Sequence, residues 1–290
     1  RVSTPWTRED ARTLAALAAA GLIFVAALLL ATTPPDALTA LDPHAVTRYN
    51  FIAGAIGIVS ALLVTATSVV MTRKHPGASG VALAHTVPFL TAAAALRLSQ
   101  SHWDTAGWAW TGLGLLIGSL AALTLPKRYR ISIAAPLVVG TVLAATGLLV
   151  RLGQLSQAGI SAILFALIIV LLQVAPWIAL AHIPVRILDA DTIEQIPAQG
   201  ITDQVSNSFV FVVALRSGGA IAAIFLTVSL MTAPETRSVS LPLTLITLGA
   251  VSLVLQTRSI RARVEVLLGA LSGLIVILVA TVLGAYADPR

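Results

Sequence analysis

Apolar runs of membrane-crossing length recur along the whole chain, and they limit the folds available to it. Two of them, LIFVAALLL at Leu22–Leu30 and ILFALIIVLL at Ile163–Leu172, are apolar on every side. A helix needs about 20 such residues to cross the hydrocarbon core of a bilayer. Hydrophobic residues make up 57% of the chain and charged residues 10%, whereas charged residues are about 25% of a soluble domain. These features predict a polytopic membrane protein.

The expected fold is an all-α transmembrane helical bundle, because backbone groups in lipid must be hydrogen-bonded within their own segment. The alternating pattern of an outer-membrane barrel is missing. Residues 1–11 are expected to form a cytoplasmic lead-in and residues 12–290 a transmembrane domain, with a cytoplasmic linker at 181–208. With ends good to about three residues, we expect nine crossings, at 12–32, 50–71, 80–98, 107–125, 131–150, 158–180, 211–232, 241–257 and 265–286.

The distribution of cations predicts a cytoplasmic N-terminus. In that orientation twelve basic residues fall on the cytoplasmic side and five on the other, as the positive-inside rule requires. Arg216 is not included in this count. We expect it at the cytoplasmic mouth of the seventh crossing, with its side chain reaching the interface.

The chain starts without methionine or a signal-peptide pattern and stops directly after a crossing. We therefore expect a cytoplasmic portion upstream and further helices downstream.

Patterns that carry chemistry are mostly absent. The sequence lacks cysteine, a phosphate-binding loop, a serine-hydrolase elbow and histidines spaced for a metal. No acidic residue falls in the middle of a predicted crossing, which counts against a proton- or sodium-coupled carrier. His85 is the strongest candidate for a functional polar group inside a crossing. We interpret it as a neutral structural histidine bonded to a carbonyl that Pro88 leaves free, in preference to a proton relay or a ligand. We predict no catalytic residue, metal or cofactor.

The net charge of +6 does not indicate nucleic-acid binding, because the cations are spread over short turns.

Small residues four apart on predicted helix faces indicate close helix packing, within a subunit or between subunits. The pairs are Gly114 and Gly118, Gly219 and Ala223, and Gly269 and Gly273. Ordinary glycine and alanine content of membrane helices accounts for part of this pattern.

Two charged segments are predicted to face the cytoplasm and to dock a partner. The linker carries Asp189, Asp191 and Glu194 between two prolines, and is either a solvated connection or a surface for a basic domain. The turn before the last crossing carries Arg258, Arg261 and Arg263. Three cations in six residues anchor the crossing at anionic headgroups, and their guanidinium forks also suit docking of carboxylates.

The order of these segments resembles EccD, the multi-spanning subunit of type VII (ESX) secretion systems of mycobacteria. The resemblance is carried by ProTrpIleAlaLeu at 176–180, by VALRSGGAIAAIFLTVSL, and by an arginine-rich turn of the form R-S-[FI]-R-x-R, matched at residues 258–263. Family members also have a ubiquitin-like cytoplasmic domain and eleven crossings, neither of which is found in this sequence. Two lysines among 18 basic residues are typical of an actinobacterial genome.

The resemblance implies a structural role in the inner membrane without catalysis. The chain would pair with a second copy, enclose a lipid-filled space, and assemble with EccB-, EccE- and EccC-like subunits, EccC being the ATPase. Two other classes stay open. A small-molecule secondary transporter predicts internal repeats and discontinuous helices, for which Pro88, Pro136 and Pro176 are candidates, and an intramembrane enzyme predicts polar residues converging at one depth.

Overall fold

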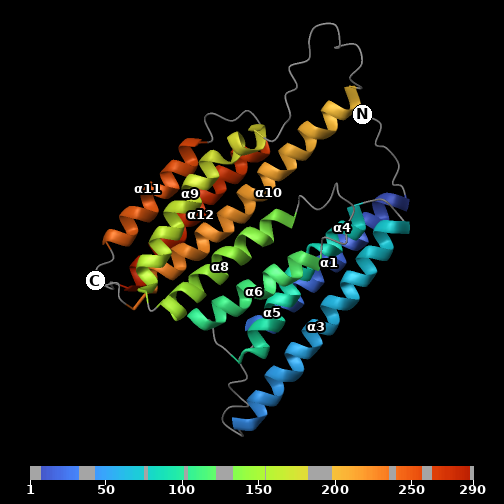
Figure 1. The fold of residues 1–290 in the computed structure, drawn as a ribbon, viewed down its shortest axis with the longest axis horizontal. Helices are drawn as coiled ribbons and strands as arrows, with labels where there is room; N and C mark the ends of the chain where they lie inside the picture. Colours follow the sequence, from blue (N-terminus) through green and yellow to red (C-terminus); the bar gives the residue numbers. More distant parts are fainter. Residues whose placement is uncertain are drawn as a thin grey trace. The chain divides into compact units, whose positions relative to one another are not determined.

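The computed structural model describes residues 8–32, 43–74, 78–100, 104–121, 133–153, 155–181, 198–234, 240–256 and 263–287. No strand occurs in these ranges, so the all-α prediction is confirmed for the described part of the chain. The helices within it (Figure 1) are α1 (Arg8–Thr32), α3 (Pro43–Lys74), α4 (Ala78–Ala84), α5 (Val87–Leu98), α6 (Thr105–Ala121), α8 (Ala134–Gly153), α9 (Gln157–Ala181), α10 (Ala198–Met231), α11 (Ser240–Gln256) and α12 (Arg263–Ala287).

Each of the predicted crossings contains a helix, and the third contains two, α4 and α5. Within the described residues, seven helical stretches have the length and apolar character to cross a membrane. The helices α6 and α11 are shorter, at 17 residues each, which corresponds to about 25 Å of rise. The chain therefore has the helices of a multi-pass membrane protein. Its predicted orientation stays a prediction.

Two helices extend well beyond the crossings predicted within them. α3 begins at Pro43 rather than near residue 50, and α10 begins at Ala198 rather than near residue 211. Hydropathy detects the part of a helix that lies in hydrocarbon, whereas a helix can continue into water as a polar extension. α10 consequently starts inside the segment 181–208 that the sequence assigned to the linker.

A proline divides the third crossing at His85 and Thr86. Pro88 has no N–H to continue the helical hydrogen bonds, and its ring collides with the carbonyl four residues earlier. Side chains satisfy the groups around the break: His85 Nδ1 lies 2.7 Å from the Val81 carbonyl oxygen, and Thr86 Oγ1 donates to the Leu83 carbonyl at 2.8 Å. His85 thus bonds a carbonyl, as the structural interpretation expected, although not the one that Pro88 itself leaves open.

Contacts among the helices divide the chain into two compact units, Arg1–Gly153 and Gln154–Arg290. In the first unit α5 packs against α1, α3 and α6, and α6 packs in turn against α8. Small side chains dominate its core, which allows the helices to approach closely. One buried cluster consists of Ala27, Ala61, Val87, Leu90 and Ala93.

In the second unit α10 packs against α9 and α12, and α11 packs against α12 and α9. Each helix contributes one large side chain that is completely buried: Phe165, Leu226, Ile246 and Val276. These four helices therefore share one core.

Candidate functional site

Gly114 and Gly118 lie on the face of α6 that packs against α5. A Cβ added at Gly114 would lie 2.7 Å from Ala92 Cα, and one added at Gly118 would lie 2.6 Å from Pro88 Cα. Neither carbon fits unless a backbone moves. Because the helices come this close, Thr91 Oγ1 of α5 donates to the Gly114 carbonyl of α6 at 2.7 Å.

The two small-residue pairs of the second unit also lie at contacts within the chain. A Cβ added at Gly219 of α10 would meet a leucine of α9 at 2.5 Å, and Ala223, one turn later, is fully buried. A Cβ added at Gly273 of α12 would lie 2.9 Å from the Ala250 carbonyl oxygen of α11. Gly269 lines a small cavity with α9, α10 and α11. A role for these residues between subunits stays a prediction.

The closest packing of α6 and α8 depends on three glycines that the sequence analysis missed. A Cβ at Gly112 would lie 2.7 Å from the Gly140 carbonyl oxygen, and one at Gly147 would lie 2.5 Å from the Ala109 backbone nitrogen. Gly140 and Gly147 are seven residues apart, a spacing that also places two residues on one helix face. A search limited to residues four apart does not detect it.

The residues predicted to dock a partner lie in two connections of the second unit. The acidic segment joins α9 to α10, and the arginine turn joins α11 to α12. The side chain of Arg263, which begins α12, is outside the described part, and so are Asp189, Asp191, Glu194, Arg258 and Arg261. Their mutual distances therefore stay untested.

The helix ends that carry the two connections lie at the same end of the second unit. Gln256, the last residue of α11, donates through Nε2 to the Leu172 carbonyl in the second half of α9 at 2.9 Å. Arg216 of α10 and Leu268 near the start of α12 line the same cavity as these two residues. The described helix ends that flank the two connections thus lie on one side of this unit.

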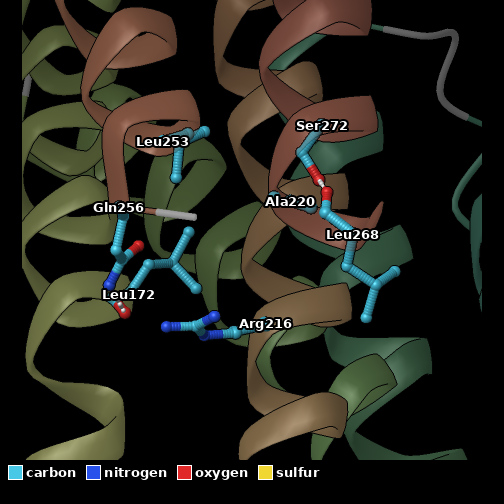
Figure 2. Close-up of a pocket in the computed structure, with 8 residues that line it drawn as sticks. Leu172, Arg216, Ala220, Leu253, Gln256, Leu268 and Ser272 are labelled. Atoms are coloured by element: carbon cyan, nitrogen blue, oxygen red, sulfur yellow. Dashed lines mark hydrogen bonds between the residues drawn. The ribbon is translucent and has the colours of Figure 1, made fainter. Parts of the chain in front are cut away.

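Arg216 is buried between helices, and the expectation that it reaches the interface is wrong. Its side chain is 7% exposed, and Figure 2 shows the guanidinium directed toward Leu172 and Gln256. The cavity beside it, with Ser272 on α12, has a volume of about 20 Å³, which is enough for one water molecule. A buried charge at mid-membrane costs about 2.5–3.5 kcal/mol on insertion scales. Arg216 lies beside the last residue of α11 and near the start of α12. It is therefore near the end of the unit at which α11 and α12 are connected.

A second polar contact joins α9 and α10 away from Arg216. Gln157 Nε2, at the start of α9, donates to the Ser229 carbonyl of α10 at 3.0 Å. The hydroxyls of Ser161 and Ser229 lie 2.6 Å apart, and all three side chains are buried. Such interhelical hydrogen bonds help to hold membrane helices together.

In the first unit a buried arginine joins three helices. Arg97 of α5 donates through Nε to the Leu30 carbonyl near the end of α1 at 2.5 Å and through Nη1 to Asn50 Oδ1 of α3 at 3.2 Å. Its guanidinium carbon lies 5.8 Å from the centre of the Tyr49 ring. A cation beside the last carbonyls of a helix also offsets the negative end of the helix dipole.

An apolar groove of about 550 Å³ lies between α3, α5 and α6 of the first unit. The hydroxyls that line it are already bonded, since Thr65 and Ser99 donate to backbone carbonyls four and three residues earlier and Thr91 donates to the Gly114 carbonyl of α6. The described lining residues therefore offer no converging polar groups to bind a polar substrate. A small-molecule site needs such groups to orient its ligand. The described residues also contain no group of three or more histidines and carboxylates able to hold a metal ion.

Comparison with known proteins gives a fold match. No protein-family model matches the sequence, and no curated protein matches it at a significant level. Among solved structures, a chain described as "MycP5-free ESX-5 inner membrane complex, State II" superimposes with a TM-score of 0.64 and 16% identity, covering 99% of this chain and 71% of that one. A chain described as "Structure of protomer 1 of the ESX-3 core complex" gives a TM-score of 0.67 and 18% identity, covering 99% and 70%. The resemblance to a type VII secretion subunit is thus confirmed at the level of the fold.

Proposed function

We propose that the chain is an EccD-like structural subunit of a type VII (ESX) secretion complex in the inner membrane of an actinobacterium. The observation that carries the proposal is the fold match to chains of ESX-5 and ESX-3 complexes over 99% of the chain. The arginine-rich turn at residues 258–263 supports it independently, because its sequence matches the family pattern R-S-[FI]-R-x-R.

The proposed role is assembly. The subunit pairs with a second copy, contacts EccB- and EccE-like subunits, and docks an EccC-like ATPase on the side of the second unit from which the acidic segment and the arginine turn leave. An opposite charge on each connection gives a partner two complementary contacts and fixes its orientation, because charge complementarity contributes specificity. The energy for export comes from the ATPase.

A small-molecule transporter is the weaker alternative. The break in the third crossing fits the discontinuous helices of carriers, whereas α9 continues through Pro176 to Ala181. The described residues that line the apolar groove, however, have their hydroxyls already bonded.

The test is to purify the tagged chain from membranes of its own host in mild detergent. A scaffold subunit brings ATP-hydrolysing activity with it, in constant ratio to the tagged chain through gel filtration. A carrier elutes as a monomer or small oligomer without that activity, and this result would overturn the proposal.

A further inference from the structure

The apolar groove of the first unit follows one face of α5, which lies between α3 and α6 (Figure 1). The α5 residues that line it recur at helical spacing, from Val87 through Thr91 and Ala94 to Leu98. From Val87 to Leu98 the helix rises about 16 Å. The hydrocarbon core of a bilayer is about 30 Å thick, so the groove is as long as the hydrocarbon of one leaflet.

The groove is apolar and opens to the surface of the chain. On its walls Ile58 and Leu62 of α3 and Ile117 of α6 are exposed, and the hydroxyls that line it are already bonded. A cavity without free polar groups does not hold ordered water, and an empty one forfeits the contacts of its lining atoms. In a membrane protein the groove is therefore suited to hydrocarbon.

One end of the groove has the side chains of a membrane interface. Leu98 at the end of α5 and Trp110 near the start of α6 line this end, and tryptophan is enriched at the headgroup level. Arg97 precedes Leu98, and its guanidinium carbon lies 5.8 Å from the centre of the Tyr49 ring of α3. The neighbouring Arg48 is exposed. Two cations therefore lie at this end of the groove.

The other end lies inside the membrane span. Val87 is the first residue of α5, directly after the helix break, and it falls within the candidate span Gly80–Leu98. At the same end Gly118 of α6 packs against the backbone of Pro88. A transmembrane helix of another subunit would need a groove across both leaflets. An acyl chain starts at the interface and ends inside the hydrocarbon, as this groove does.

We propose that the groove binds one acyl chain of an anionic phospholipid, with the end of the chain near Val87 and the headgroup at the end that carries Arg48 and Arg97. The cations select an anionic headgroup, because arginine near the membrane surface attracts acidic lipids. The groove is formed by a single copy of the chain. The inference therefore goes beyond the proposed function and depends only on insertion in a membrane.

Native mass spectrometry of the full chain, purified alone in detergent and freed of lipid, measures the affinity for each added phospholipid. The probes are palmitoyl-oleoyl phosphatidylglycerol, which is anionic, and phosphatidylcholine with the same acyl chains. In Leu62→Trp/Ile117→Trp a larger ring on each wall fills the groove. The matched control, Leu63→Trp/Leu120→Trp, places the same rings on the same two helices outside the groove lining. The replaced side chains are 65% and 63% exposed in the groove variant and 63% and 58% exposed in the control.

The first phosphatidylglycerol should bind the groove variant about tenfold more weakly than the parent, whereas the control should bind it as the parent does. Phosphatidylcholine should bind the parent more weakly than phosphatidylglycerol. Arg48→Gln should lower the affinity for phosphatidylglycerol about fivefold, the contribution of one arginine near an anionic surface, and leave phosphatidylcholine unchanged. Its control is Arg151→Gln, at the exposed end of α8. Arg97 is kept because it holds three helices together.

The proposal is wrong if the groove variant binds phosphatidylglycerol as tightly as its control, if the parent binds both lipids equally, or if Arg48→Gln binds phosphatidylglycerol as the parent does. A further contrary result is a loss of dimers in the groove variant with unchanged lipid binding, which would mean that a second copy covers the groove. The proposed function fails separately, when a chain that binds the lipid normally brings no ATPase with it from membranes.

Discussion

Two buried arginines show what individual cations do in a chain with 10% charged residues. Arg97 in the first unit and Arg216 in the second are 8% and 7% exposed. Arg97 bonds a backbone carbonyl of another helix, and Arg216 is directed toward one. An arginine between helices is retained where backbone carbonyls or polar side chains need a donor, since the guanidinium offers five N–H groups in a fixed plane.

Replacing Arg97 by lysine is therefore expected to destabilise the protein although the charge is kept. One ammonium group cannot reach both the Leu30 carbonyl and the Asn50 amide, and a lost bond to a charged group costs about 1.5–3 kcal/mol. Thermal unfolding in detergent measures the effect. Arg151→Lys is the control, because Arg151 is exposed at the end of α8. Equal unfolding temperatures for Arg97→Lys and Arg151→Lys would show that charge alone matters at residue 97.

Among the helices, hydropathy predicted the segments that form apolar helices, because that choice depends on composition; nine crossings were expected, and seven stretches of the described residues have the length and apolar character to cross a membrane. It did not predict that α3 and α10 extend beyond the expected crossings, since polar extensions carry no apolar signal. The pairs Gly114/Gly118 and Gly269/Gly273 were visible as spacings, whereas the partner of each helix was not. The bond from Gln256 to the Leu172 carbonyl, which Pro176 leaves without its helical donor, depends on tertiary packing that local sequence does not encode.

The α6–α8 contact gives a direct test of glycine packing. Gly112→Ala places a Cβ 2.7 Å from the Gly140 carbonyl oxygen, and overpacking of this kind typically costs about 1–3 kcal/mol. Gly21→Ala is the matched control in α1, where an added Cβ meets nothing within 4 Å and helix propensity favours alanine by about 1 kcal/mol. Unfolding in detergent should show a loss for the first variant and none for the second. A Gly112→Ala protein as stable as the parent would mean that α6 and α8 are less closely packed.

The arginine turn is the element through which the proposed docking acts. Changing Arg258, Arg261 and Arg263 together to lysine keeps the positive charge that anchors the crossing but removes the guanidinium fork. We expect unchanged topology and a lower recovery of the ATPase with the purified complex, whereas changing all three to glutamine should impair both. If the triple lysine variant retains the ATPase at the parental level, the turn is a topological anchor, and docking has to be sought at Asp189, Asp191 and Glu194.

For the whole molecule, the orientation in the membrane follows from the cation count and is open to a simple test. Twelve cations on one side and five on the other require a cytoplasmic N-terminus by the positive-inside rule. A reporter fused after Lys127 should be cytoplasmic, and one fused after Glu235 should be external. Opposite results at both positions would place the acidic segment and the arginine turn outside the cell, where no ATPase could reach them.

The mass and composition of the assembled complex test most directly whether this chain is a paired scaffold subunit, as we propose. Native mass spectrometry of the detergent-extracted assembly, with two differently tagged copies expressed in one cell, counts the copies and identifies their partners. We expect a species that contains both tags together with an ATPase and further membrane subunits in fixed ratio. A species of one or two copies of this chain and nothing else would contradict it.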